Sequence, residues 1–373
     1  MTGCKLLIVF GTRPEAIKLF PVIRALKAQS ALDVRVCVTG QHRDMLDSVL
    51  CLVGLVPDID LDLMKPGQSL EELEGRLLAG IGAVLDTERP DRVIVQGDTA
   101  SAVTAAKAAH GRGIPVAHVE AGLRSGNLAH PWPEEGYRRA ITSFADLHFA
   151  PTQSAVDALR VEGIDPARVH LTGNSGIDAL LHVRDMLRDG LTSPAIAALL
   201  RRFAGRRIVA VTCHRRENLG ELASIAQALA QLAGREDVAI ILPLHPNPEI
   251  GAAFRTKLDC LAKVALTAPL DYPDFVALLD ACHFVLTDSG GIQEEAPALG
   301  KPVLVMRETT ERPEGVAAGT ARLVGTDPAN IVMQAARLLD DPAAYAAMAR
   351  AHSPYGDGRA AERIAAVLAE KSL

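Results

Sequence analysis

The sequence predicts an α/β protein with two doubly wound domains, each built on a parallel sheet that helices cover on both faces. The chain has 373 residues, which is too long for one comfortable core and suits two domains of roughly 150 to 190 residues. Short apolar runs, many of them rich in β-branched residues, alternate along it with segments of helical spacing. Hydrophobic residues make up 49% of the chain and aromatic residues only 3%, a composition typical of Ala-, Val-, Leu- and Ile-rich helices packed on sheets.

The first domain is predicted over residues 1–180. Its strands are apolar runs without strict alternation of polar and apolar residues, which fits strands covered on both faces, and right-handed helical crossovers should join them. In chain order, the six predicted strands cover residues 5–10, 33–39, 92–96, 115–120, 147–151 and 169–173.

The second domain is predicted over residues 181–355 and repeats this pattern. Residues 175–205 have helical periodicity that DGLTSP interrupts, so this stretch is predicted to connect the two domains. The Ala-rich final segment, residues 356–373, is predicted to be a helix that packs back on the first domain. The six strands of the second domain are predicted at residues 207–212, 238–243, 263–268, 283–287, 302–306 and 321–325.

Charge and composition exclude several classes of function. The net charge of −6 gives no overall attraction to nucleic acid or to an anionic membrane surface, so any phosphate group must be bound by a local site. No apolar run reaches the roughly 20 residues of a membrane-spanning helix, and the first strand runs directly into charged residues, so we expect a cytoplasmic protein without a signal peptide. The six cysteines are scattered without a C-x-x-C pair and are predicted to be buried free thiols.

Polar residues gather directly after the predicted strands. In doubly wound sheets, ligands bind beyond the carboxyl ends of the strands, and two such sheets facing each other would form a cleft between the domains. The stretches that follow the strands include GTRPE, QGDT, EAGLRS, CHRREN, HPNP and DSGG. Chemistry is therefore predicted at these strand ends.

The stretch GTRPEAIK is a candidate phosphate site. Gly11 allows a turn, Pro14 is predicted at the first position of a helix, and Arg13 and Lys18 stand near the start of that helix. The free N–H groups of a helix N-terminus attract anions, and two cations beside them suit a diphosphate. The alternative is a pair of solvated charges.

The stretch DSGGIQEEA repeats this arrangement in the second domain. Ser289 is predicted to cap a helix, and Gly290 and Gly291 let backbone amides approach an anion closely. Glu295 can accept hydrogen bonds from two ribose hydroxyls, or it can serve only the electrostatics of the helix N-terminus. Neither G-x-G-x-x-G nor G-x-x-x-x-G-K-[ST] occurs in the chain, so a dinucleotide fingerprint and a P-loop are both unsupported.

Carboxylates that could exchange protons with a substrate follow two strands and open a helix. Asp98 lies in QGDT, Glu120 in HVEAG and Glu134 in PWPEE. Clustered carboxylates drive each other's pKa values apart, which lets one act as a base and another as an acid at neutral pH. A single aspartate after a strand can alternatively be a helix cap. For Asp98, proton transfer and helix capping therefore both remain open.

Two histidines also follow predicted strands, His214 in CHRREN and His245 in HPNP. No H-x-x-x-H or Cys/His ligand spacing occurs, so a metal site is rejected. Phosphate contact or proton transfer by His214 fits the sequence better.

With these motifs assembled, the chain closely resembles the non-hydrolysing UDP-N-acetylglucosamine 2-epimerases. That family has two Rossmann-like domains whose parallel sheets face a central cleft, the glycosyltransferase-B (GT-B) architecture. The resemblance covers nearly the whole chain, and many motifs carry it in one order. These motifs are GTRPEAIKLFPVI, TGQHRDML, QGDT, HVEAGLRS, PWPEE, FAPT, GNSGIDAL, HRREN, HPNP, DYPDF, DSGGIQEEAPALGKPVLVMRETTERPEG and LVGTD.

The resemblance implies a role for each candidate residue. Three carboxylates and one histidine form the catalytic set: Asp98, Glu120, Glu134 and His214. Residues of both domains are implied to bind the substrate. The diphosphate is contacted by Arg13, Lys18 and His214, and the uracil by Phe275 and the backbone near Leu270. The phosphate and ribose are held by Ser289, Gly290, Gly291 and Glu295, with Arg312 nearby. No cofactor is implied, and the expected partners are a UDP-sugar and a second copy of the chain in a homodimer.

The implied reaction inverts C2 of the sugar in UDP-N-acetylglucosamine. Its C2–H bond is not next to a carbonyl, so expelling UDP from C1 is needed to acidify it, and the resulting 2-acetamidoglucal then re-adds UDP after protonation on the other face. The product, UDP-N-acetylmannosamine, would supply surface polysaccharide. Three alternatives stay open: a hydrolysing epimerase that releases free N-acetylmannosamine, a GT-B glycosyltransferase, and a UDP-sugar-binding regulator without turnover, which the full acidic set disfavours.

Three positions depart from the family pattern. Tyr137 stands where the family usually has Asn, Ser143 replaces a common Asp, and Gly176 interrupts the pattern G-N-[ST]-V-I-D. Because Tyr137 lies beside the predicted catalytic helix, we expect this replacement of Asn by Tyr to change the shape of the sugar pocket.

Overall fold

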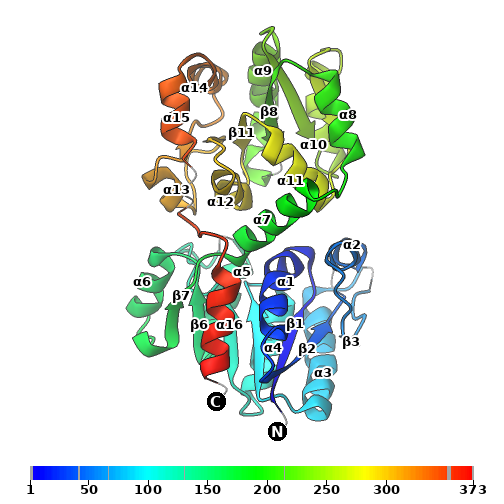
Figure 1. The fold of residues 1–373 in the computed structure, drawn as a ribbon, viewed down its shortest axis with the longest axis vertical. Coiled ribbons are helices and arrows are strands. Elements are labelled where there is room, and N and C mark those ends of the chain that lie inside the picture. The colour runs from blue at the N-terminus through cyan, green and yellow to red at the C-terminus, as the bar shows by residue number, and fades with distance from the viewer. Residues whose placement is uncertain are drawn as a thin grey trace. The chain divides into compact units, whose positions relative to one another are not determined.

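The computed structural model describes residues 3–40, 43–65, 67–129, 131–213, 215–350 and 354–371 (Figure 1). The chain divides into two compact units, Met1–Ala179 with Tyr355–Leu373, and Leu180–Pro354. Each unit has a parallel sheet with helices between successive strands, so the predicted α/β class with two parallel sheets is confirmed. Among the described residues, no helix is long and apolar enough to cross a membrane.

The sheet described in the first unit has seven parallel strands in the order β3-β2-β1-β4-β5-β6-β7. All six predicted strands are present, whereas the edge strand β3 is missing from the prediction because its two residues form no readable pattern. The strands are β1 (Cys4–Phe10), β2 (Leu32–Val38), β3 (Ile59–Asp60), β4 (Arg92–Gln96), β5 (Val116–Val119), β6 (Leu147–Ala150) and β7 (Val169–Leu171). The helices are α1 (Arg13–Lys27), α2 (Arg43–Val53), α3 (Leu70–Glu88), α4 (Ala100–His110), α5 (Glu134–Phe144), α6 (Gln153–Val161), the 3₁₀ turn η1 (Pro166–Arg168) and α16 (Ala360–Glu370), while α7 (Ser175–Arg188) runs across the unit boundary.

The sheet described in the second unit has six parallel strands in the order β10-β9-β8-β11-β12-β13, each at a predicted position. The strands are β8 (Arg207–Thr212), β9 (Val238–Pro243), β10 (Val264–Thr267), β11 (Phe284–Thr287), β12 (Val303–Val305) and β13 (Ala321–Leu323). The helices are α8 (Pro194–Arg202), the 3₁₀ helix η2 (Arg216–Glu221), α9 (Leu222–Ala233), α10 (Pro248–Leu258), α11 (Tyr272–Ala281), α12 (Gly290–Ala298), α13 (Pro313–Ala317), α14 (Pro328–Asp340) and α15 (Pro342–Met348).

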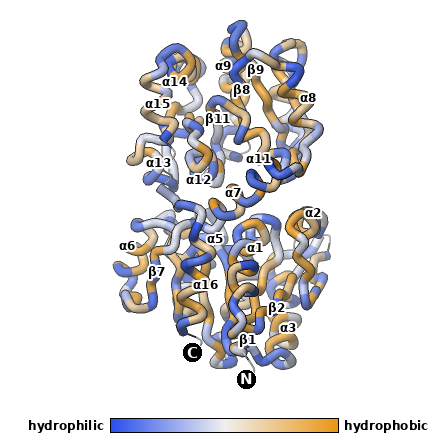
Figure 2. Tube along the Cα trace, viewed as in Figure 1, coloured by the Kyte–Doolittle hydropathy of each residue, from blue (hydrophilic) through white to orange (hydrophobic). Residues whose placement is uncertain are grey.

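Apolar side chains of the central strands fill the interior of each unit. Figure 2 shows the hydropathy of each residue along the chain. In the first unit, β1 is fully buried from Leu6 to Phe10, and the Ala-rich helix α4 packs its small side chains on β1 and β4. In the second unit, β8, β9 and β11 are buried in the same way. Burying each Leu or Ile side chain contributes about 1.5–3 kcal/mol, so these strands anchor the segments that follow them.

Three of the six free cysteines are buried as predicted, but Cys51 and Cys260 are exposed and Cys4 is partly exposed. The prediction of buried thiols is therefore wrong for half of the set. Cys51 lies in the last turn of α2, and Cys260 follows the end of α10, so neither belongs to a buried strand.

The last helix, α16, belongs to the first unit and packs against α1 (Figure 1). Asp178 of α7 fixes its start, because the Asp178 carboxylate accepts hydrogen bonds from the N–H groups of Ala360 (3.2 Å) and Ala361 (2.9 Å). A carboxylate at this place satisfies N–H groups that the helix itself leaves unpaired. These two bonds join residues that are 182 and 183 positions apart in the sequence but belong to one unit.

Two buried histidines should make the protein unstable in acid. His118 of β5 and His148 of β6 are neighbours across the sheet, and burial lowers the pKa of His118 to about 3 and that of His148 to about 4. As the pH falls below about 6.5, these two imidazoles bind protons in the unfolded chain but not in the folded chain. We therefore expect the free energy of unfolding to drop by about 2 kcal/mol or more between pH 7 and pH 5. Urea unfolding at both pH values measures this drop. A His148→Gln variant with an unchanged drop would contradict the assignment to that histidine.

Candidate active site

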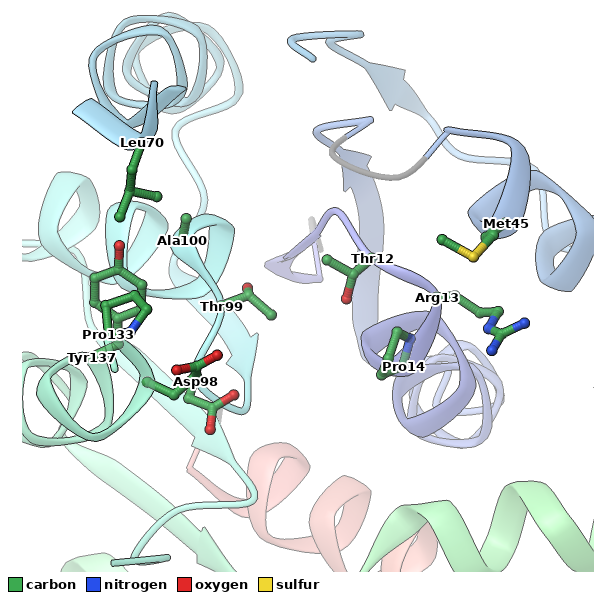
Figure 3. Close-up of a pocket in the computed structure, with 11 residues that line it drawn as sticks. Thr12, Arg13, Pro14, Met45, Leu70, Asp98, Thr99, Ala100, Pro133 and Tyr137 are labelled. Carbon is green, nitrogen blue, oxygen red and sulfur yellow. The ribbon is translucent and has the colours of Figure 1, made fainter. Parts of the chain in front are cut away.

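The candidate site of the first unit lies where the strand order reverses. β1 has β2 on one side and β4 on the other, so the segments that follow β1 and β4 diverge beyond the sheet. A cavity of about 480 Å³ lies at these strand ends. It is lined by Thr12, Arg13, Pro14, Met45, Leu70, Asp98, Thr99, Ala100, Pro133, Glu134 and Tyr137 (Figure 3).

Helix α1 brings a cation and its own N-terminus to this cavity. The helix begins at Arg13, so Pro14 takes the second helical position rather than the predicted first. The cause is a capping box, in which Thr12 accepts a hydrogen bond from the Glu15 N–H and the Glu15 carboxylate accepts one from the Thr12 N–H. Arg13 therefore stands at the positive end of the helix dipole, where an anion is favoured.

Asp98 follows β4 and is held by Arg138 of α5. The Nε and Nη2 atoms of Arg138 both lie 2.7 Å from Asp98 Oδ2. Burial raises the pKa of Asp98, the charge of Arg138 opposes this rise, and the negative charge of Glu120 adds to it. A carboxyl group with a raised pKa is suited to accepting and returning a proton near neutral pH.

Glu120 follows β5 and forms an ion pair with Lys18 of α1. Its φ of 63° lies in the left-handed region, which costs a non-glycine residue about 1–3 kcal/mol and is concentrated at functional sites. Both side chains of the pair are largely buried. The ion pair thus fixes Glu120 close enough to Asp98 for the two carboxylates to interact.

Glu134 is the first residue of α5 and lines the cavity. Its Oε2 atom is buried and has no hydrogen-bond partner among the described residues. Leaving a carboxylate oxygen buried and unpaired is costly, so this atom is available for a ligand in the cavity. The structure therefore brings Asp98, Glu134 and Arg13 to one cavity and ties Glu120 to Lys18 beside Asp98.

Tyr137 forms part of the cavity wall. Its hydroxyl donates a hydrogen bond to Glu74 Oε1 of α3 at 2.5 Å, and its ring packs against the core of the first unit. Burial and Glu74 both raise the pKa of this phenol, which therefore stays protonated. The residue that departs from the family pattern thus shapes the cavity itself, with its hydroxyl already committed to Glu74.

Two residues that hold the site together are missing from the sequence analysis, Arg138 and Glu15. Arg138 stands in PWPEEGYRR, where it has the spacing of an ordinary helix-surface charge, and no local signal pairs it with Asp98. Glu15 does have a signal, because T-x-x-E before an apolar run is the signature of a capping box. That signature would have located the helix start and marked Glu15 as a capping residue.

In the second unit, the segments after β8 and β11 lie at the corresponding reversal of strand order. Helix α12 begins at Gly290 with Ser289 as its N-cap residue, but the Ser289 side chain makes no capping hydrogen bond, so the prediction of a side-chain cap is wrong. The Ser289 N–H donates instead to Thr287 Oγ1 at 2.9 Å, which sets the turn between strand and helix. The helix therefore leaves the Ser289 hydroxyl unused.

The N-terminus of α12 leaves space for an anion. A Cβ atom at Gly290 would lie 3.5 Å from Arg215 Nη2 and 3.9 Å from Arg312 Nη2, and a Cβ atom at Gly291 would meet nothing within 4 Å. Neither glycine has a positive φ, so the backbone does not require glycine at either position. Two guanidinium groups beside the N–H groups of a helix N-terminus form a site that suits a phosphate.

Ion pairs and hydrogen bonds fix these two arginines. Arg312 pairs with Glu294 of α12. The fully buried Asp288 accepts hydrogen bonds from the Arg215 N–H at 2.9 Å and from Asn218 Nδ2 at 3.1 Å, which joins the segment after β8 to the one after β11. The Arg312 guanidinium is thus held by Glu294, and the backbone of Arg215 is held by Asp288.

The other predicted residues of the second unit lie on neighbouring elements. Phe275 is half-buried in the first turn of α11, and Leu270 lies just before that helix. Glu295 lies in α12. The pKa of Tyr272 is raised mainly by burial and secondly by the negative charge of Glu295. The buried hydroxyl of Tyr272 has no hydrogen-bond partner among the described residues. His214 lies outside the described residues. Those residues contain no group of three or more His, Cys, Asp or Glu side chains that could hold a metal ion.

Comparison with known proteins gives one consistent result. The family model described as UDP-N-acetylglucosamine 2-epimerase matches residues 24–369. Over 364 residues, the chain is 49% identical to the UDP-N-acetylglucosamine 2-epimerase of Escherichia coli K12 and 51% identical to a probable UDP-N-acetylglucosamine 2-epimerase of Ralstonia nicotianae, each time covering 96% of this chain and 97% of the relative. A crystal structure of UDP-GlcNAc 2-epimerase from Neisseria meningitidis bound to UDP-GlcNAc matches with a TM-score of 0.90 at 42% identity, over 98% of this chain and 100% of that one.

Proposed function

Because the chain belongs to the UDP-N-acetylglucosamine 2-epimerase family, we propose that it interconverts UDP-N-acetylglucosamine and UDP-N-acetylmannosamine. The observation that carries this proposal is the cavity of the first unit, where Asp98 and Glu134 lie with Arg13 at the N-terminus of α1. Groups that can exchange a proton thus line the same cavity as a group that can bind a diphosphate. Epimerisation at C2 through departure of UDP requires both.

In the proposed reaction, the bond between C1 and the UDP oxygen breaks, and its electron pair leaves with the phosphate. The positive character at C1 acidifies the proton on C2, a carboxylate accepts that proton, and the electrons of the C–H bond form the C1=C2 double bond of 2-acetamidoglucal. In the return step, a proton is added to the opposite face of C2 and the phosphate oxygen to C1. UDP therefore leaves and returns within one turnover.

The first unit is assigned to the sugar and the diphosphate. Asp98, Glu120 and Glu134 transfer protons and stabilise the positive charge at C1, which the raised pKa of Asp98 and the unpaired Glu134 Oε2 atom support. Arg13 and Lys18 stabilise the departing diphosphate, because cations placed where negative charge develops lower the barrier to its departure.

The second unit is assigned to UDP. The open N-terminus of α12 between Arg215 and Arg312 supports this assignment, since it matches the needs of a phosphate group. The resemblance adds the uracil and ribose contacts and a diphosphate contact from His214. The assigned residues are Leu270, Phe275, Ser289, Gly290, Gly291, Glu295, Arg312 and His214.

Substitution of Gly291 by alanine should leave the fold at least as stable and weaken UDP binding. A Cβ atom at this position meets nothing within 4 Å, and alanine is the better helix former by about 0.5–1 kcal/mol, so Tm should not fall. A methyl group between the helix N–H groups and a phosphate should raise the Kd of UDP by about tenfold or more. Thermal unfolding and calorimetric titration with UDP measure the two effects. An unchanged Kd would remove Gly291 from the phosphate site.

Analysis of the product tests the proposed function. Purified protein is incubated with UDP-N-acetylglucosamine, and the sugars are separated by anion-exchange chromatography. We expect UDP-N-acetylmannosamine to accumulate to an equilibrium with the substrate. Free N-acetylmannosamine and UDP would identify a hydrolysing epimerase, turnover only with an added acceptor would identify a glycosyltransferase, and binding without conversion would identify a regulator.

The wider setting is also part of the proposal. Family membership supports a homodimer that works in the cytoplasm and supplies activated N-acetylmannosamine for surface polysaccharide. Light scattering from the purified protein tests the dimer, which a monomer mass at assay concentrations would contradict.

A further inference from the structure

The Glu15 carboxylate joins two segments that the reaction uses. Glu15 Oε2 accepts hydrogen bonds from the Gly11 N–H (3.1 Å), the Thr12 N–H (2.8 Å) and the Thr12 hydroxyl (2.7 Å), all in the turn between β1 and α1. Glu15 Oε1 accepts a fourth bond from the Thr99 hydroxyl at 2.7 Å, in the turn after β4. One side chain thus connects the turn that precedes Arg13 with the residue that follows Asp98.

A capping box alone does not account for this arrangement. Helix α3 begins with a second capping box, in which Glu72 accepts a hydrogen bond from the Ser69 N–H at 2.8 Å, and there the carboxylate is exposed. Glu15 is 1% exposed, and burial raises its pKa to about 6 despite its four hydrogen bonds. Burying a carboxylate is costly, and capping a helix does not require it, as the exposed Glu72 shows. Burial and the bond to Thr99 therefore distinguish Glu15 from an ordinary capping residue.

We propose that Glu15 is a positioning residue of the epimerase: through Thr99, it holds the turn of Asp98 in register with the diphosphate-binding start of α1. The inference rests on the proposed function. Proton removal from C2 and departure of UDP from C1 occur on adjacent atoms of one substrate, so the base and the diphosphate site must keep a fixed spacing. A misplacement of about 1 Å in such a pair can cost about 100-fold in rate.

Substitutions of Thr99 test the bridge from its far end. Thr99→Val keeps the shape of the side chain and removes the hydroxyl, whereas Thr99→Ser removes the methyl group and keeps the hydroxyl. We expect Thr99→Val to lower kcat by about 10- to 100-fold with KM and the Kd of UDP changed by less than about threefold, and we expect Thr99→Ser to recover most of the loss. A general loss of structure would instead weaken UDP binding together with kcat.

The Thr99 hydroxyl also caps α4, since it accepts a hydrogen bond from the Ala102 N–H at 3.0 Å, so its two roles must be separated. Glu15→Gln alters the bridge without touching that cap and should lower kcat by about tenfold. Glu72→Gln is the matched control in the second capping box and should leave kcat unchanged. If both residues act through one bridge, Glu15→Gln combined with Thr99→Val should lose no more activity than Thr99→Val alone.

The outcomes separate this inference from the proposed function. Wild-type kcat in Thr99→Val or in Glu15→Gln, or losses that multiply in the double variant, would overturn the positioning role while the wild-type protein remains an epimerase. An inactive wild-type protein would overturn the proposed function and this inference with it. Three results together would support the bridge: Thr99→Val lowers kcat, Thr99→Ser keeps most of the wild-type kcat, and adding Glu15→Gln to Thr99→Val lowers kcat no further.

Discussion

Replacing Asp98 with asparagine should lower kcat by about 100- to 10,000-fold, the range that a positioned proton-transfer group contributes. Asparagine has nearly the same shape and can still accept hydrogen bonds from Arg138, so the site should keep its geometry. It cannot accept a proton from C2. The Kd of UDP should stay within about threefold of the wild-type value, because the contacts assigned to UDP lie on other residues.

Steady-state kinetics with UDP-N-acetylglucosamine and calorimetric titration with UDP measure this pair of effects. Asp157→Asn is a suitable control, because Asp157 is an exposed residue of α6 that accepts a hydrogen bond from Gln153. The control should keep its activity. Substantial turnover by Asp98→Asn would exclude Asp98 from the proton transfer.

Replacing Arg138 with methionine should lower kcat by about 10- to 100-fold at neutral pH. Burial raises the pKa of Asp98, and Arg138 restrains that rise with its charge and a hydrogen bond. Without Arg138 the pKa of Asp98 rises further, so a smaller fraction of this carboxyl group is ionised at a given pH and the base form is depleted. The acid limb of the pH–rate profile should therefore move to higher pH, with partial recovery of kcat as the pH is raised.

The neighbouring arginine provides a matched control. Arg139 lies on the same helix and pairs with Glu135 at 3.2 Å, whereas Arg138 makes its shorter contacts with Asp98. Arg139→Met should therefore leave the pH–rate profile in place. A profile for Arg138→Met that falls equally at every pH would show that Arg138 does not act through the ionisation of Asp98.

The strands could be predicted because strands buried on both faces are continuous apolar runs. The predicted runs 207–212 and 238–243 coincide with β8 and β9. β3 consists of two residues at a sheet edge, which is too short for such a run. Helix starts depend on single hydrogen bonds, so α1 begins at Arg13, one residue earlier than predicted, after the Thr12 capping box. Helix α12 begins at Gly290, and its N-cap residue Ser289 lacks the expected side-chain hydrogen bond.

The candidate carboxylates could be singled out because their residue type and their place, after a strand or at the start of a helix, are local properties of the sequence. Arg138 and Glu15 could not be assigned in this way, since each acts through a distant partner. Arg138 reaches Asp98 across 40 residues, and Glu15 reaches Thr99 across 84. Such pairs depend on the packing of α5 and α1 beside the strand ends, which no short pattern encodes.

Proton NMR of the purified protein with UDP-N-acetylglucosamine in deuterated water tests the proposed chemistry most directly. If a carboxylate removes the C2 proton while UDP is expelled and returned, signals of UDP-N-acetylmannosamine should appear, deuterium from the solvent should replace the proton at C2, and the sugar should remain attached to UDP. Formation of UDP-N-acetylmannosamine that keeps the original proton at C2 would contradict the proposed mechanism.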